Sequence, residues 1–481
     1  MFRIFFFSLC VGLSCLSAQT FSVQVNEGHG AGRYLAGDTV YIFSRTLGDY
    51  EVFTSWTIPG NQVSFVADEG EWRGAFIMPN RNVVLTANFD TVPADFLRLE
   101  PIRTTSIAQP FYTAFQPNHK GTVFLLHGSG GGASGWANPD RGDGFQVAKD
   151  LYYAGYSVVI PECQESTAGM DLNGDGRIRW VSFPMDTLNN IDYQNLNIAI
   201  DSFARRGDLE RNQLYSIGMS SGGGFSGAFS VTFSTRASAV YCASSQEIVA
   251  DTTQADLLFC LMPFDEAIGP DGIVDARMNH QTMVNRGLCS QFFLNQPFPI
   301  YPAIFERAQV DSMISMLLFQ ELANNQFITS KHFLTDPVSE IERDIQSNLG
   351  NWPAFRSLSS IQINQVRSLL QVAYGEHKFF ANHNKRTIQF FDDPCGLVSS
   401  NFPEATQSAF LKVAPNPTSR KVEVTGIKPP FDWEVFGQDG RLLRNGKTWQ
   451  HTSIELPIAS GIYLLRVRAG SEVFSRKIVK R

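Results

Sequence analysis

The chain has 481 residues and a formal net charge of −7, and 43% of its residues are hydrophobic. Such a length accommodates roughly two to four domains, each with a substantial core. The mildly acidic balance gives no basic face for nucleic acid, so no nucleic-acid partner is expected.

Residues 1–18 have the pattern of a secretory signal peptide. Arg3 precedes an apolar run that is too short to span a bilayer, and small residues lead up to Ala18. Cys15 offers an alternative as a lipid-attachment site, although the small residues also suit ordinary cleavage near Ala18. No later segment is apolar over the length of a membrane-crossing helix. We therefore expect an exported protein, secreted or attached to the outer-membrane exterior.

Cleavage of this segment removes two of the seven cysteines. Cys242 and Cys260 lie in apolar strand-like runs, which predicts that they belong to the core. Cys289 and Cys395 lie in loop-like sequence, where an oxidising compartment could pair them. The fifth, Cys163, makes the count odd, so at least one thiol stays unpaired.

Residues 19–92 predict a small all-β module. Apolar and polar residues alternate, for example over 21–25 and 39–43, and Gly, Asp and Asn punctuate the runs at short intervals. From Gly32 through Trp56 to Phe89, the pattern resembles small β-repeat modules of bacterial surface proteins. The resemblance implies a spacer or adhesive role.

Residues 97–395 predict an α/β domain. An apolar strand over 122–126 leads into His127-Gly128 and a glycine-rich loop. Further strand and helix segments then alternate, which predicts a mostly parallel sheet with helices on both faces. These segments are expected at 145–153, 155–160, 190–204, 237–242 and 256–262.

The most informative stretch is an apolar strand that runs into Gly218-Met219-Ser220-Ser221-Gly222. This order predicts a sharp turn from a strand to a helix that exposes the Ser220 hydroxyl. The glycines are needed because bulky neighbours would clash where the backbone turns so tightly. The helix that follows directs free N–H groups at developing negative charge.

The glycine-rich loop and this Gly-x-Ser-x-Gly turn, in this order, resemble the α/β-hydrolase family over residues 97–395. The resemblance implies a Ser220 nucleophile and an oxyanion hole formed by two backbone amides. These amides map to Ser221 and Ser129, and Gly130 is the nearest rival of Ser129. His127 is expected to hold the loop rather than to act as a base.

A serine nucleophile needs a base, and the base needs an orienting acid. The family order is Ser, acid, His, and Asp265 follows the second strand after the turn. Glu266, Asp271 and Asp275 are the alternatives for the acid. His377 follows an apolar run over 369–374 that predicts a last strand. His383 is the alternative base.

Asp265 and His377 are 377 − 265 = 112 residues apart, which is more than one connecting helix needs. The insert at about 278–355 has apolar residues at helical spacing and predicts a helical cap. An apolar underside of this cap would suit an acyl or aromatic substrate. The alternative is a helical insert that packs elsewhere.

A second insert carries Asp171, Asn173 and Asp175, followed by Gly176. Oxygen ligands at positions 1, 3 and 5 with glycine at 6 begin a calcium loop, but Ser182 stands where a bidentate carboxylate is expected. A weaker calcium site completed by Asp186 or water and a rigid Asx-turn loop both remain open. In either case, Trp180 and Arg177 are expected to shape the rim of the pocket.

Residues 411–481 predict a small β-sandwich. The segments Ala414–Ser419, Phe436–Leu442 and Gly461–Leu465, with the basic end, resemble the C-terminal sorting domain of the type IX secretion system. The resemblance implies translocation by that machinery and says nothing of the reaction.

The sequence therefore predicts an α/β-hydrolase fold flanked by two small all-β domains. The leading hypothesis is a secreted carboxylic ester hydrolase that needs no cofactor and acts on a small or polymeric ester. A peptidase or other acyl hydrolase on the same fold is the alternative in chemistry. A non-catalytic surface adhesin is the alternative from another class.

Overall fold

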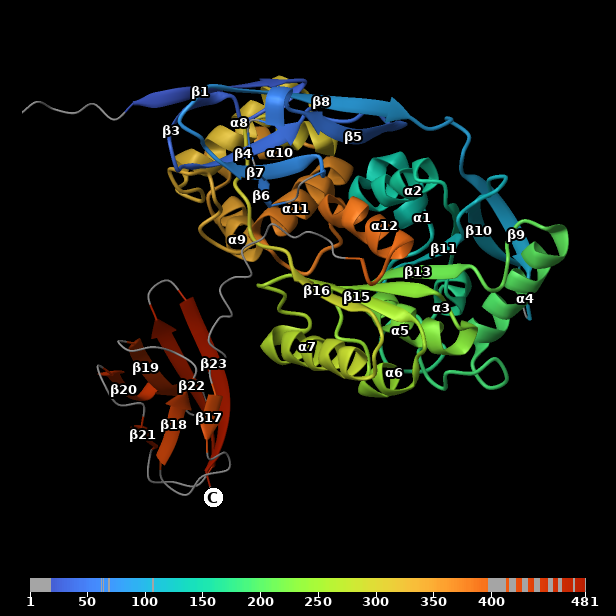
Figure 1. Ribbon diagram of the computed structural model, residues 1–481. Coiled ribbons are helices and arrows are strands. Elements are labelled where there is room, and N and C mark those ends of the chain that lie inside the picture. The colour runs from blue at the N-terminus through green and yellow to red at the C-terminus, as the bar shows by residue number, and fades with distance from the viewer. Residues whose placement is uncertain are drawn as a thin grey trace, which may run out of the picture. The chain divides into compact units, whose positions relative to one another are not determined.

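We analysed a computed structural model of the chain (Figure 1). It describes residues 19–396, apart from 62, 64, 68, 69, 106 and 107, and the strands between 412 and 480. Residues 1–18, where the signal peptide is predicted, lie outside the described residues. The chain divides into two compact units, 1–399 and 400–481.

The N-terminal module consists of two four-stranded sheets. One sheet has the order β3-β1-β8-β5, with β3 (Gly32–Leu35), β1 (Thr20–Asn26), β8 (Val83–Thr91) and β5 (Glu51–Thr57). The other has the order β2-β4-β7-β6, with β2 (Gly28–His29), β4 (Thr39–Ser44), β7 (Arg73–Ile77) and β6 (Phe65–Ala67). A short 3-10 turn, η1 (Pro59–Asn61), follows β5. Alternate apolar side chains such as Val23, Ile42 and Phe76 form the core between the sheets.

This module packs directly on the α/β domain, within one compact unit. Phe43 and Phe53 belong to the same buried cluster as residues of the central sheet. Glu71 accepts hydrogen bonds from the backbone amides of Lys385 and Arg386, 2.9 and 3.3 Å away. An independent spacer would not share its core with the neighbouring domain, so the module is structurally part of the same unit as the α/β domain.

The α/β domain is built on an eight-stranded sheet with the order β16-β15-β14-β13-β11-β12-β10-β9. Its strands are β9 (Arg98–Arg103), β10 (Ala108–Ala114), β11 (Thr122–Leu126), β12 (Ser157–Pro161), β13 (Leu214–Met219), β14 (Ala237–Tyr241), β15 (Asp256–Leu261) and β16 (Ser290–Leu294). The six strands from β11 to β16 are parallel, and β10 pairs antiparallel with β12 and β9. The carboxyl ends of the parallel strands therefore share one edge, where sites gather in such sheets.

Helices cover both faces of this sheet (Figure 1). Val123 and Leu125 of β11 face a core shared with α2, whereas Phe124 and Leu126 face a core shared with α4 and α5. This alternation follows from the two-residue period of a strand. The helices around the sheet are α1 (Ser134–Ala137), α2 (Asp143–Tyr153), α3 (Gln164–Ala168), α4 (Ile191–Arg206), α5 (Ser221–Phe233), α6 (Glu247–Thr252), α7 (Gly269–Asn285) and α12 (Asn384–Asp392), with 3-10 turns η2 (Pro139–Arg141) and η5 (Ala381–His383).

The helical cap differs in its limits from the predicted 278–355. Residues up to Asn285 belong to α7, which covers the sheet, and β16 then adds an edge strand. The inserted helices follow β16 and continue to Tyr374. They are η3 (Ile304–Ala308), α8 (Ser312–Asn324), α9 (Val338–Ser347), η4 (Leu349–Asn351), α10 (Pro353–Arg356) and α11 (Ser360–Tyr374). The predicted start of the cap at 278 is wrong, because the short Phe-rich run of β16 fits a helix pattern as well as a strand pattern.

The strand expected at 369–374 is absent, because these residues form the end of α11. A capping box between Ser359 and Gln362 starts this helix. Val366, Leu370 and Ala373 are buried at spacings of four and three, which is helical periodicity. A window of six apolar residues was too short to reveal that period.

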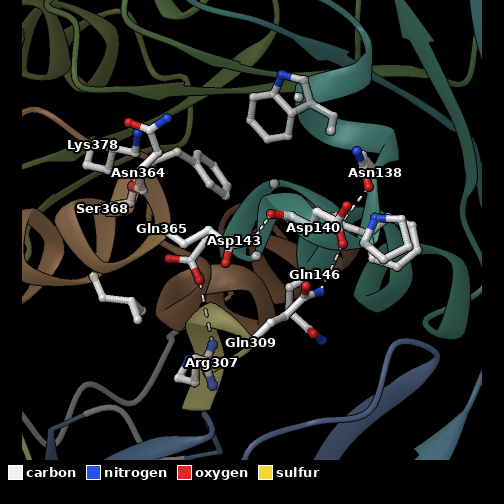
Figure 2. Close-up of a pocket in the computed structure, with 18 of the residues that line it drawn as sticks. Asn138, Asp140, Asp143, Gln146, Arg307, Gln309, Asn364, Gln365, Ser368 and Lys378 are labelled. Carbon is white, nitrogen blue, oxygen red and sulfur yellow. Dashed lines mark hydrogen bonds and ion pairs between the residues drawn. The ribbon is translucent and has the colours of Figure 1, made fainter. Parts of the chain in front are cut away.

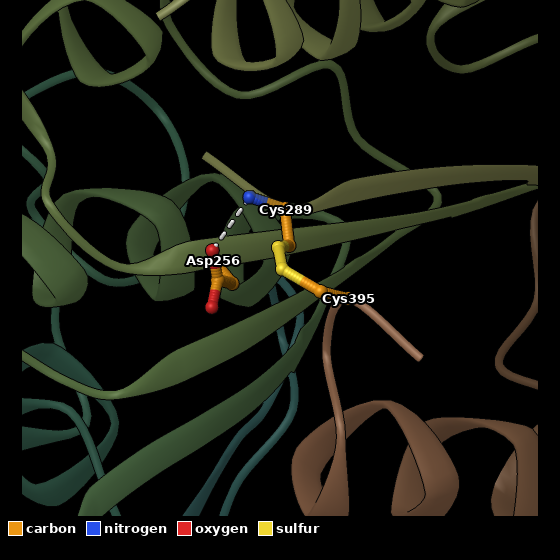
Figure 3. Close-up of a disulfide and its surroundings, with 3 residues drawn as sticks. All are labelled: Asp256, Cys289 and Cys395. Carbon is orange, nitrogen blue, oxygen red and sulfur yellow. Dashed lines mark hydrogen bonds between the residues drawn. A yellow bond between two sulfur atoms is a disulfide. The ribbon is translucent and has the colours of Figure 1, made fainter. Parts of the chain in front are cut away.

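A disulfide joins Cys289, just before β16, to Cys395, just after α12 (Figure 3). Their Cα atoms are 5.2 Å apart, and the Cys289 amide donates to Asp256 Oδ1 at 2.8 Å. Cys163, Cys242 and Cys260 are buried and unpaired.

The C-terminal unit consists of two antiparallel sheets among its described residues. One has the order β17-β18-β21, with β17 (Lys412–Ala414), β18 (Lys421–Thr425) and β21 (Ser453–Glu455). The other has the order β20-β19-β22-β23, with β20 (Leu442–Thr448), β19 (Phe431–Phe436), β22 (Gly461–Ala469) and β23 (Glu472–Lys480). Val422, Val435 and Leu465 belong to its own buried core. Across both units, the described helices include none with the length and apolarity to cross a membrane.

Candidate active site

Ser220 stands at the turn between β13 and α5, with φ 58° and ψ −121°. A non-glycine residue with positive φ is strained, and such strain is common where a side chain must be presented for chemistry. The turn depends on glycines, because a Cβ on Gly218 would lie 1.9 Å from the Gly222 carbonyl oxygen. A Cβ on Gly222 would lie 2.2 Å from the Leu126 carbonyl oxygen. Only glycine allows the strand, the turn and β11 to pack this closely.

The structure brings Ser220, His377 and Asp265 into one hydrogen-bonded row. His377 Nε2 lies 2.8 Å from Ser220 Oγ. His377 Nδ1 lies 2.8 and 2.7 Å from the two carboxylate oxygens of Asp265. Gly375, with φ 95°, ends α11. It turns the chain toward the elbow, which is the sharp turn between β13 and α5 that carries Ser220. This arrangement can activate a hydroxyl, because the histidine can accept its proton while the carboxylate orients the ring.

Asp265 is held rigidly at the end of the segment after β15. Its side chain is fully buried, whereas the side chain of His377 is 24% exposed. Besides His377, Asp265 Oδ1 accepts from the amides of Ala267 and Ile268, 3.0 and 3.2 Å away. These donors stabilise the charged carboxylate that a protonated imidazole would need beside it. The alternatives Glu266, Asp271, Asp275 and His383 make no contact with Ser220 among the described interactions.

Cys242 is a neighbour of this row that the sequence pattern predicted only as a core residue. Its Sγ lies in the group with Asp265 and His377 whose ligand atoms are all within 4.8 Å of one another. Burial, followed by the nearby Asp265 carboxylate, raises the thiol's pKa well above its usual value. The thiol therefore stays protonated and donates to the Lys378 carbonyl at 3.3 Å. An apolar strand-end cysteine gives no sequence signal of this proximity.

The sequence predicts the backbone amides of Ser221 and Ser129 as the donors of an oxyanion hole. Ser221 is the first residue of α5, so its amide has no carbonyl one turn earlier in the helix. Ser129 is exposed, and no described residue accepts a hydrogen bond from its amide. The amide of the rival, Gly130, donates to the Ile178 carbonyl at 2.8 Å. Of these two loop amides, that of Ser129 is the one without an acceptor among the described residues.

His127 fixes the orientation of the Ser129 amide. Its Nε2 accepts from the Cys163 amide at 3.2 Å, so the proton lies on Nδ1, which donates to the Gly128 carbonyl at 2.9 Å. Burial lowers the pKa of His127 to about 4, which keeps the ring neutral. A peptide carbonyl and the following N–H point in opposite directions. Holding the Gly128 carbonyl therefore turns the Ser129 N–H away from His127.

A cavity of about 550 Å³ (Figure 2) reaches Met219, the residue before Ser220, but Ser220, His377 and Asp265 are not among its lining residues. Gly128 and Met219 line it at the end near Ser220, and the cap contributes α11 and η3. The loop Thr46–Asp49 of the N-terminal module forms part of the wall. Figure 2 shows many polar side chains on this wall, among them Asn138, Asp140, Asp143, Gln146, Arg307 and Gln309.

The apolar cap underside expected from the sequence is therefore wrong for most of this cavity. Gln309 Nε2 of the cap donates to Asp140 Oδ1 at 3.0 Å, and Arg307 lies 3.6 Å from Asp143. These contacts need polar residues on both sides of the cap boundary, which a helical hydrophobic pattern does not reveal.

The loop with Asp171, Asn173 and Asp175 keeps its calcium assignment as a prediction. Asp171 accepts from the amides of Gly174 and Gly176, both at 2.7 Å, and Asn173 Oδ1 accepts from the Asp175 amide at 2.9 Å. Arg179 pairs with Asp175 at 2.6 Å and, as the main cause, lowers the pKa of that carboxyl. These bonds describe an Asx-turn loop, and a guanidinium beside Asp175 disfavours a cation there.

Trp180 and Arg177 do not line the cavity, contrary to expectation. Trp180 is buried and stacks on Phe225 of α5, with ring centroids 4.6 Å apart. The centroid of its ring also lies 5.2 Å from that of His127, so Trp180 packs against the first residue of the glycine-rich loop. Arg177 is exposed.

No protein-family model matches the chain, and a search of curated proteins finds no match. Among solved structures, the chain is similar to a Pyrococcus furiosus esterase at 10% identity, with a TM-score of 0.32 over 43% of this chain and 86% of that one. It is also similar to a putative dienelactone hydrolase from Klebsiella pneumoniae at 14% identity, with a TM-score of 0.31 over 46% and 96% of the two chains. A thermostable esterase gives 13% identity and a TM-score of 0.32 over 57% and 89%.

Proposed function

We propose that the protein is a serine hydrolase of the α/β-hydrolase type that cleaves carboxylic esters. The hydrogen-bonded row of Ser220, His377 and Asp265 at the elbow is the single observation that carries this proposal. The strand order of the central sheet and the strained serine between β13 and α5 support the same fold type.

In the proposed first step, His377 Nε2 takes the proton of Ser220 Oγ while this oxygen forms a bond to the ester carbonyl carbon. The carbonyl oxygen becomes an oxyanion, which the amides of Ser129 and Ser221 stabilise. His377 then gives its proton to the alkoxide leaving group as the ester C–O bond breaks. An acyl-enzyme on Ser220 remains.

Water releases the acyl group in the second step. His377 accepts a proton from the attacking water, and the resulting tetrahedral intermediate uses the same two amides. Collapse breaks the bond to Ser220 Oγ, which recovers its proton from His377. Asp265 holds His377 in the tautomer that bears its proton on Nδ1.

We further propose export with the type IX secretion machinery as partner, on the basis of the sequence of 1–18 and 411–481 alone. The described strands of the C-terminal unit are compatible with a separate sorting domain. A reporter placed between residues 1–18 and 400–481, expressed in a bacterium that has this machinery, should reach the surface or the medium. Retention of the fusion in the periplasm would contradict the proposal.

The ester assignment is tested with p-nitrophenyl acyl esters of rising chain length, with wild type and Ser220→Ala side by side. The proposal expects turnover that the substitution abolishes. The same assay with p-nitroanilides separates an esterase from the peptidase alternative. An amine leaving group must receive a proton from His377 before the bond breaks, whereas an alkoxide leaving group depends on this proton less. No turnover of any ester, together with no labelling by a fluorophosphonate, would favour the adhesin alternative.

A further inference from the structure

The wall of the cavity carries no net charge although it is strongly polar. Its carboxylates are Asp49, Asp140, Asp143 and Glu306. Its cationic side chains are Lys149, Arg307, Arg367 and Lys378. Equal numbers of the two signs disfavour a strongly charged ligand, because neither sign of charge is concentrated in the cavity. A neutral ligand that makes many hydrogen bonds fits this wall.

Donors and acceptors are interleaved along the wall. Asp143 lies 3.6 Å from Arg307, and the Lys149 ammonium lies 3.3 Å from the Gly48 carbonyl of the module loop. A hydroxyl group donates and accepts at one oxygen atom, so it suits a surface where both kinds of partner alternate. A peptide offers fixed donors and acceptors and adds side chains that require apolar subsites.

Two polar side chains line the cavity from different parts of the molecule. Asn364 on the cap helix α11 and Asp49 on the module loop are both exposed and line the cavity. Neither side chain makes a hydrogen bond with a described residue. They are thus placed to contact the same bound molecule from the cap and from the N-terminal module.

The end of the cavity near the elbow combines apolar side chains with the polar residues His127 and Lys378. Met219 directly precedes Ser220, and Phe379 follows His377 by two residues. Trp136 packs edge-on against Phe379, with ring centroids 4.6 Å apart. The cavity thus has apolar surface from Met219, Trp136 and Phe379 near the reacting serine, and its many carboxylate and amide side chains lie further along the wall. Its volume of about 550 Å³ falls within the range of small-molecule sites.

We propose that the ester cleaved at Ser220 is joined to a carbohydrate, whose hydroxyl groups bind the polar part of this cavity. The N-terminal module then takes part in substrate recognition through its loop Thr46–Asp49. This inference rests on the proposed ester hydrolysis and names its substrate class.

The test compares kcat/KM for sugar esters and for sugar-free esters of similar size with the full chain. The pairs are an acetylated methyl xyloside against cyclohexyl acetate, and the methyl ester of a glucuronic acid glycoside against methyl cyclohexanecarboxylate. We expect at least one sugar ester to exceed its partner by tenfold or more, on the order of two hydrogen bonds. Turnover of the sugar-free esters without any preference for sugar esters would overturn the inference and leave the proposed function standing.

Substitutions on the two walls locate the preference. Asn364→Leu and Asp49→Ala should each lower kcat/KM for the preferred sugar ester by about two- to tenfold more than for its sugar-free partner. Asn285→Leu, exposed on α7 and outside the cavity, is the matched control and should change neither substrate's kinetics. Equal losses on both substrates would contradict a sugar site here, as would better turnover of an N-acyl peptide amide than of any sugar ester. If the wild type hydrolysed none of these esters, the proposed function itself would be refuted.

Discussion

Asp265 Oδ2 lies 2.7 Å from His377 Nδ1, although 112 residues separate the two in sequence. The inserted cap helices occupy most of that interval. Asp265 and His377 can therefore meet only because the chain returns, after the insert, to the edge of the sheet where β15 ends. The carboxylate is fully buried and also bound by two backbone amides, so it cannot follow a displaced histidine. The predictions below depend on this rigidity.

Asp265→Asn should lower kcat by about 10³- to 10⁴-fold with little change in fold. The amide can donate to Nδ1 and thereby stabilises the tautomer that cannot accept the Ser220 proton. The measurement is steady-state hydrolysis of p-nitrophenyl acetate, with circular dichroism to show that the variant is folded. Asp275→Asn, which changes another acidic candidate on α7, serves as the matched control and should retain activity. A fall of less than tenfold in Asp265→Asn would argue against the assigned acid.

His127→Ala should reduce kcat by roughly 10- to 100-fold, while KM changes less. The Gly128 carbonyl loses one of its two donors and keeps only the Gly131 amide at 3.1 Å, so the Ser129 amide is held less firmly toward the oxyanion. His127→Asn keeps a donor near that carbonyl and should recover part of the loss. Equal activity of the two variants would show that His127 fills space rather than orients the peptide.

His127 should also make stability depend on pH. Its pKa is about 4 in the folded protein and about 6.5 when unfolded, so between these values the unfolded chain binds more protons. The stability contributed by the neutral ring is complete above pH 6.5 and is lost as the pH falls toward 4, by about 3 kcal/mol in total. Urea unfolding of wild type and His127→Asn at several pH values measures the difference. Parallel curves over this window would contradict the burial assigned to the ring.

Reduction of the Cys289–Cys395 disulfide should lower the free energy of unfolding by about 2–4 kcal/mol, because the bond closes a loop of about 100 residues. Unfolding by urea with and without dithiothreitol measures this. The double variant Cys289→Ser, Cys395→Ser should match the reduced wild type and show no response to the reagent. A response in that variant would show that another cysteine pair contributes.

The sequence predicted the elements that depend on short local patterns. The turn around Ser220 needs its glycines within five residues, and Asp265 follows a strand whose apolar run is unmistakable. His377 was singled out although the segment before it proved to be helix, because Gly375 permits the turn in either case. The cap limits, the polar cavity and the packing of the module could not be predicted, since each depends on contacts between segments far apart in the chain. Phe43 and Glu71 carry no sign that their partners lie in another domain.

Mass spectrometry after treatment with a fluorophosphonate tests the central claim most directly, because it asks whether Ser220 is an activated nucleophile without assuming a substrate. The account predicts one adduct per chain, on the peptide that contains Ser220, and no adduct in Ser220→Ala. Its formation should be strongly slowed in Asp265→Asn. An adduct on a different serine, or ester hydrolysis that persists in Ser220→Ala, would contradict the assignment.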